Sequence, residues 1–61
     1  MKREVKVIKM SIEEYMENHR EEYEEGNLFD YPLDELDHIV NDTDIEVVAL
    51  IGDRLYEIPS N

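Results

Sequence analysis

The stretch from Met10 to Gly26 predicts an amphipathic helix, and this helix limits what the rest of the chain can form. Ser11 followed three residues later by Glu14 is a capping box, in which each side chain bonds a free backbone N–H of the first turn. Gly26 suits the left-handed residue that commonly ends a helix. We therefore expect a helix over about residues 12–25.

The two faces of this helix differ in chemical character when each residue is given about 100° of turn. The apolar face consists of Ile12, Tyr15, Met16, His19 and Tyr23. The opposite, acidic face consists of Glu13, Glu14, Glu17, Glu21, Glu24 and Glu25. Glu22 borders the apolar face, and Arg20 is the only cation of the helix. The apolar face predicts packing against the rest of a small core.

Two features favour a binding role for the acidic face over simple solvation. Solvated helices commonly place lysine four residues from glutamate, which gains about 0.2–0.5 kcal/mol per pair, and this helix contains no lysine. Glutamates also crowd its last turn, where the helix dipole makes each one cost about 0.3–1 kcal/mol. A small domain that accepts these costs is expected to use the charges on a partner. A solvated helix face is the alternative.

The net charge of −11 is large for 61 residues, and it is unevenly distributed. The first ten residues hold four cations and one acid, a net charge of +3, whereas the remainder holds two cations and sixteen acids, a net charge of −14. This balance excludes direct nucleic-acid binding by the usual route, which needs lysine and arginine on phosphates. The expected partner is a basic protein surface.

Length and composition indicate a single small domain. A chain of this size buries only about 60% of its unfolded surface, and without cysteine it has no disulfide or thiolate zinc site to stabilise it. Dimerisation is then the simplest way to add core. The sequence shows no apolar run of the ~20 residues that a membrane span needs and no signal peptide, so a cytoplasmic location is expected.

The remaining elements are predicted from the spacing of apolar residues and from the turn-forming residues between them. A strand is expected over about residues 2–10, followed after the first helix by an apolar segment (Leu28, Phe29 and Tyr31) that packs on the core. A short helix is expected over about residues 32–40, with Pro32 in its first position. A hairpin with the two-residue loop Gly52-Asp53 is expected over about residues 45–58.

The hairpin loop fixes the strand register, because it pairs Ile51 with Arg54 and Leu50 with Leu55. One face of the hairpin then carries Val47, Ala49, Tyr56 and Ile58, and the other carries Val48, Leu50 and Leu55. Two helices can cover only one face of a three-stranded sheet, so the second face is expected to form a dimer interface through Val48, Leu50 and Leu55. The predicted fold is α+β in the order β-α-α-β-β, a small, three-stranded, mainly antiparallel sheet with helices on one face.

Motifs of catalysis are missing from the sequence. Neither a glycine-rich phosphate loop nor a nucleophile elbow is present, and Ser11 is explained as a helix cap. His19 is expected in the core and His38 at a helix end, and the acids around Asp42 lack the spacing of a calcium loop. We expect no enzyme, no cofactor and no metal site.

In size, charge and the glutamate face of residues 13–25, the chain resembles small acidic phage-encoded proteins that block host factors. Several such proteins mimic DNA and bind the basic surface of the nucleoid protein HU, a uracil-DNA glycosylase, a polymerase or a CRISPR nuclease. The resemblance implies a role as an inhibitor in host takeover. From the acidic helix face itself we expect partner binding through Glu13, Glu14, Glu17, Glu21, Glu24 and Glu25, extended by Asp30, Asp34, Glu35 and Asp37.

A second resemblance, in element order and in the stretch from Ile45 to Ser60, is to the Phd/YefM antitoxins. Those proteins dimerise, bind operator DNA and neutralise a toxin. The net charge of −11 is unlike that of a protein that binds operator DNA. The alternative function is therefore an antitoxin-like or scaffold interaction module that works through its apolar sheet face.

Overall fold

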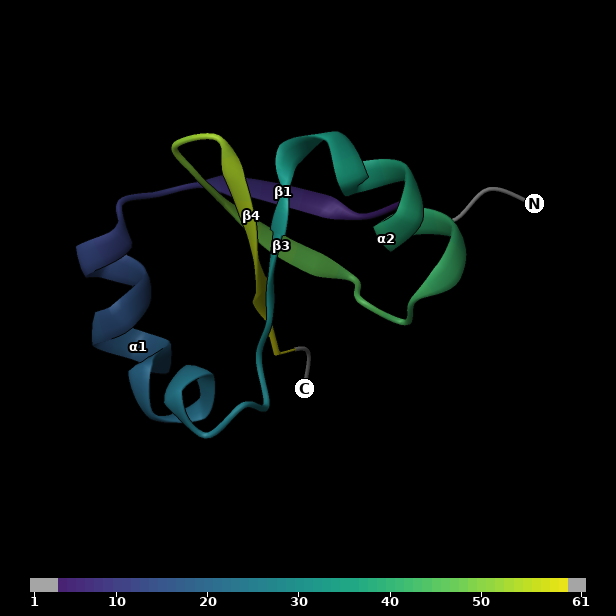
Figure 1. The fold of residues 1–61 in the computed structure, drawn as a ribbon. Helices are drawn as coiled ribbons and strands as arrows, with labels where there is room; N and C mark the ends of the chain where they lie inside the picture. The colour runs from purple at the N-terminus through teal and green to yellow at the C-terminus, as the bar shows by residue number, and fades with distance from the viewer. Residues whose placement is uncertain (1–3, 60–61) are drawn as a thin grey trace.

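The computed structural model describes residues 4–59, which form two helices and one sheet (Figure 1). In chain order the elements are β1 (Lys6–Lys9), α1 (Ile12–Glu24), β2 (Asp30–Pro32), the 3₁₀ turn η1 (Leu33–Glu35), α2 (Leu36–Asp42), β3 (Val47–Ile51) and β4 (Arg54–Ile58). The α+β class is therefore confirmed. The predicted first strand began at residue 2, and residues 2 and 3 lie outside the described residues.

The sheet has four strands in the order β1-β3-β4-β2. β1 runs parallel to β3, whereas the β3–β4 and β2–β4 pairs are antiparallel. The predicted three strands and β-α-α-β-β order are thus wrong, because residues 30–32, predicted as the end of a core-packing segment and the start of the second helix, form the strand β2. Strands disfavour aspartate and proline, and β2 contains both in three residues, so its sequence carries no strand signal.

The ends of α1 follow their sequence signals. The Ser11 side chain accepts a hydrogen bond from the Glu14 backbone N–H at 3.1 Å. At the other end Gly26 has a φ of 82°, its N–H donates to the Tyr23 carbonyl, and the next residue donates to the Glu22 carbonyl. This pair of bonds is a Schellman motif, which satisfies the last carbonyls of the helix.

The β3–β4 hairpin has the predicted register, with Ile51 opposite Arg54 and Leu50 opposite Leu55. Gly52 has a φ of 62°, the left-handed value that the first loop position of a tight hairpin requires. The second helix differs from its prediction. Pro32 has extended backbone and ends β2, η1 covers Leu33–Glu35, and α2 runs from Leu36 to Asp42.

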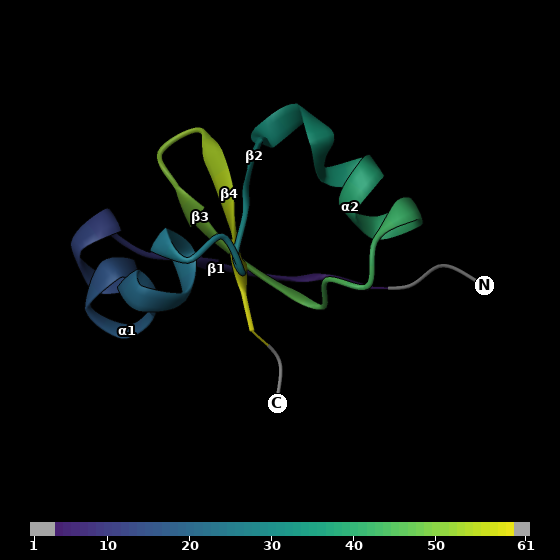
Figure 2. The same cartoon turned by 60° about the horizontal axis from the view of Figure 1, so that its bottom comes forward.

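The two helices cover opposite faces of the sheet, and each face has its own core (Figures 1 and 2). The core on the α2 side is built around Ile39, Ile45, Val48 and Leu55. The core on the α1 side is built around Tyr15, Leu28 and Ala49. The expectation of both helices on one face is therefore wrong. Crossing from α1 to α2 through β2 places the second helix on the other side.

This arrangement covers the residues predicted to form a dimer interface. Val48 and Leu55 are fully buried within one chain, and Leu50 is partly buried against the same core. Their apolar character is explained by α2, whose Ile39 is also fully buried. A second copy could pack on this face only if the sheet were uncovered there, and α2 covers it.

Candidate partner-binding surface

The outer face of α1 carries the six glutamates predicted to bind a partner, and all six are exposed: Glu13, Glu14, Glu17, Glu21, Glu24 and Glu25. Inner positions of the same helix are buried or half-buried, with Tyr15 at 0% exposure. The helix is therefore oriented about its axis so that the carboxylates face solvent. The aromatic residues on its inner face fix this orientation.

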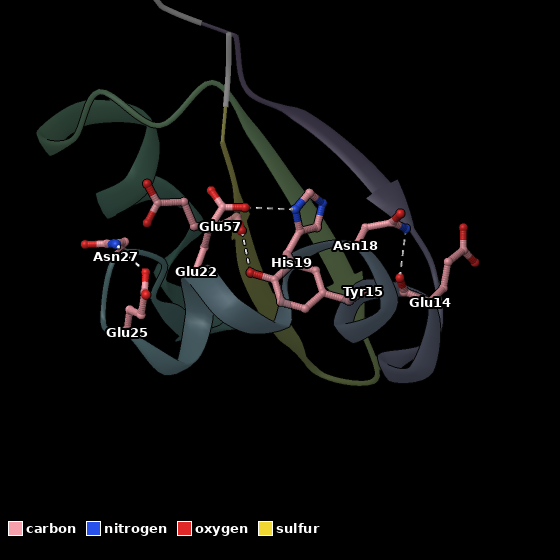
Figure 3. A network of polar contacts seen from close by, with 8 residues as sticks. All are labelled: Glu14, Tyr15, Asn18, His19, Glu22, Glu25, Asn27 and Glu57. Atoms are coloured by element: carbon pink, nitrogen blue, oxygen red, sulfur yellow. Dashed lines mark hydrogen bonds and ion pairs between the residues drawn. The ribbon is translucent and has the colours of Figure 1, made fainter.

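Tyr15 anchors this inner face to the sheet. Its hydroxyl donates to the Glu57 backbone carbonyl of β4 at 2.6 Å, a bond drawn in Figure 3. The ring packs edge-on to Tyr23 at a centroid distance of 6.2 Å and tilted to Tyr56 at 5.1 Å. His19 lies beside it with ring centroids 5.2 Å apart, as expected for a histidine on the inner face. This cluster fixes the orientation in which α1 presents its acidic face.

Burial, with a smaller contribution from Glu57, raises the pKa of Tyr15 to about 12. The folded pKa exceeds the ordinary value of 10.0, so as the pH rises the unfolded chain loses the Tyr15 hydroxyl proton before the folded chain does. The free energy of unfolding should therefore fall as the pH rises from about 10 to about 12. We expect Tyr15→Phe to flatten this fall and to cost about 0.5–1.5 kcal/mol near neutral pH. Urea unfolding at a series of pH values measures both effects. An unchanged pH profile would contradict the anchoring role.

The acidic side chains of the outer face are not neutralised within residues 4–59. In this part of the chain Arg54 forms an ion pair with Asp30, and two histidines lie near acids, His19 near Glu22 and His38 near Asp42. The one side-chain hydrogen bond to an outer-face carboxylate comes from Asn27 to Glu25 at 3.4 Å (Figure 3). Arg20 makes no ion pair with its glutamate neighbours in this range. Within residues 4–59 the outer face is thus a strip of negative charge without ion pairs.

Asp30 lies on β2, apart from the outer face of α1, and its carboxylate makes bonds within the fold, while its predicted part in partner binding stays a prediction. One of its carboxylate oxygens accepts from Arg54 Nε at 2.7 Å, and the other accepts from the Tyr23 hydroxyl at 3.1 Å. These bonds connect β2 to β4 and to the last turns of α1. Asp30 therefore has a structural role, although its side chain is still 28% exposed.

Replacing Asp30 with asparagine should lower the melting temperature by several degrees, because the amide cannot reproduce the charged bond to Arg54. Asp34→Asn removes the same charge from an exposed position and is the matched control, with no expected change. Thermal unfolding followed by circular dichroism measures both. Equal melting temperatures for the two variants would return Asp30 to the list of surface residues.

The acidic residues of η1 and α2 lie on the other side of the sheet from α1 (Figure 2). Asp34, Glu35 and Asp37 are exposed, but the sheet separates them from the glutamates of α1. The structure therefore brings the six α1 glutamates together and places these three apart. Asp34, Glu35 and Asp37 thus form a separate acidic patch, and their predicted part in partner binding stays a prediction.

Comparison with protein-family models, curated proteins and solved structures found no match to this chain. Among the described residues, no group of three or more histidine, cysteine or acidic side chains is arranged to hold a metal ion. None of the helices in residues 4–59 has the length and apolar content needed to cross a membrane. The outer face of α1 is the feature of the structure from which a function can be argued.

Proposed function

We propose that this protein is an acidic binding protein that inhibits a DNA-binding protein by occupying its basic nucleic-acid site. The observation that carries the proposal is the outer face of α1, where six exposed glutamates lie together without neutralising partners among residues 4–59. Free carboxylates on a rigid helix suit a surface of arginine and lysine side chains that normally holds phosphates.

The linear density of charge supports mimicry of nucleic acid. α1 has 13 residues and is therefore about 20 Å long. The glutamates from residue 13 to residue 25 average about 3 Å of helix axis per charge, and one DNA strand presents a phosphate about every 3.4 Å. Glutamate side chains are flexible, so they can adjust to the positions of individual cations on the partner.

The overall charge of −11 acts in the same direction. It attracts a basic protein from a distance and raises the association rate, while it repels nucleic acid itself. The resemblance to phage-encoded inhibitors favours a target in a host bacterium, such as the nucleoid protein HU, a polymerase or a DNA-processing enzyme. We propose inhibition of this target as part of host takeover.

The antitoxin-like alternative finds less support because its working surface is covered. A partner on the sheet face of Val48, Leu50 and Leu55 would first have to displace α2, which packs there through Ile39. A merely solvated helix face remains the competing interpretation of the glutamates, and it predicts no specific partner.

Capture from a bacterial lysate at low salt, with elution by a salt gradient, tests the proposal. We expect a DNA-binding protein that is released by moderate salt, because screening shortens charge interactions to about 8 Å at physiological ionic strength. Duplex DNA added at low salt should release the same protein. A partner that resists high salt and is indifferent to DNA would refute mimicry.

A further inference from the structure

The two edges of the sheet differ in whether another strand can join them. β2 has only three residues, and its register turns the backbone of Asp30 and Pro32 outward. Pro32 has no N–H to donate, and η1 begins directly after it. This edge is therefore closed to further strands, as edges of natural sheets commonly are.

The β1 edge is open. Lys6 N–H donates to Glu46 and Met10 N–H donates to Leu50, so the backbone of these residues points toward β3. By the alternation of a strand, the N–H and carbonyl groups of Val7 and Lys9 then point away from the sheet. All four residues of β1 are exposed. Val7 and Ile8 are 43% and 36% exposed, on opposite faces of the strand.

We infer that this edge pairs with β1 of a second copy of the chain, antiparallel about a two-fold axis at Val7. The outward N–H and carbonyl of Val7 would then bond those of Val7 in the second copy, which joins the two four-stranded sheets into one. Lys6 would lie opposite Ile8 and Lys9 opposite Val5, so no two lysines face each other directly. The register is self-complementary, and it covers the exposed valine and isoleucine on both faces.

The charge distribution favours this occupant over other strands. An acidic strand is repelled by a protein of net charge −11, and a basic strand is tolerated only in a register that, like that of a second copy, sets apolar residues opposite Lys6 and Lys9. A second copy approaches through the described residues 4–10, where Lys6 and Lys9 stand against Glu4 and the net charge is +1.

The pairing should be weak. Stable interfaces bury about 1,200–2,000 Å², more than one short strand edge provides, so a dissociation constant above about 10 µM is expected. The acidic face of α1 takes no part in it, so failure of this inference leaves the proposed function standing, and the reverse also holds.

Backbone amide NMR of the ¹⁵N-labelled protein from about 50 µM to about 1 mM tests the pairing at salt near 0.15 M. We expect the outward amides of Val7 and Lys9 to shift with concentration, and the inward amides of Lys6 and Ile8 to shift less. Sedimentation velocity over the same range should show dimer. Constant shifts and a monomer up to the highest concentration would overturn the inference, as would shifts confined to α1 or α2.

Val7→Pro is the decisive variant, because it removes an N–H that makes no bond to β3 and proline is tolerated on such an edge. It should raise the dissociation constant about tenfold or more through the two lost hydrogen bonds. Val7→Ile keeps the N–H and the apolar contact and should dimerise like the natural chain. Equal dimerisation of folded Val7→Pro would contradict the inference. If that variant does not fold, the concentration series on the natural chain decides.

Discussion

Leu55→Ala should destabilise the protein by about 2–5 kcal/mol, the usual cost of removing a fully buried leucine. Leu55 lies in the central part of the sheet and packs in the core with Val48 and Ile39 of α2. A chain of this length has a total stability of about 3–9 kcal/mol. Much of the variant should therefore be unfolded at room temperature, whatever the protein concentration. Urea unfolding by circular dichroism measures the loss.

Leu33→Ala is the matched control, because it removes the same atoms from a side chain that is 46% exposed. Its effect should stay within about 0.5 kcal/mol. The comparison separates two accounts of the sheet face beneath α2. If Leu55 served only a dimer interface, its replacement would leave a folded monomer with nearly unchanged stability at low concentration, and the core described here would be wrong.

Removing three outer-face charges with Glu17→Gln, Glu21→Gln and Glu24→Gln should weaken partner binding by about 10–100-fold. The three side chains are exposed, so the fold should be retained and the loss should appear in binding alone. Most of the loss should lie in the association rate and in the steepness of the salt dependence. Surface plasmon resonance with the captured partner at several salt concentrations measures both.

The matched control removes three charges from the other side of the sheet with Asp34→Asn, Glu35→Gln and Asp37→Asn. Both triple variants change the net charge from −11 to −8, since each loses three acids. The control should bind within about threefold of the natural chain, because only long-range attraction changes. Equal losses in the two variants would show that net charge, rather than the outer face of α1, determines binding.

Local signals in the sequence were enough to predict α1 and the hairpin. Ser11 and Gly26 mark the ends of the helix by bonds made within a few residues, and both bonds are present. The Gly52-Asp53 loop sets the pairing of β3 and β4 residue by residue. Each of these features depends on neighbours in the chain, which is why sequence alone predicts them.

The errors lie where structure depends on distant residues. β2 is a strand because β4 offers it backbone partners and because Arg54 binds Asp30, and neither contact is visible in the sequence of residues 30–32. Missing β2 led directly to the wrong side for α2. Apolar residues on both faces of the hairpin correctly indicated that both faces are covered, but the second face is covered by α2 of the same chain.

The candidate site was predictable in part for the same reason. Helical period placed the six glutamates of α1 on one face, and the structure leaves all six exposed. The ion pair of Asp30 could not be predicted because it spans 24 positions of the chain. The anchoring role of Tyr15 was signalled only by its place on the apolar face, since its bond partner lies 42 positions away.

Competition between this protein and duplex DNA for the captured partner tests mimicry most directly. Fluorescence anisotropy would follow a labelled duplex bound to the partner while the protein is added. Mimicry predicts complete release of the duplex by the natural chain and by the α2-side control, and much weaker release by the outer-face variant. A complex that holds the partner, the duplex and the protein together would contradict the proposal that the glutamates of α1 occupy the DNA site.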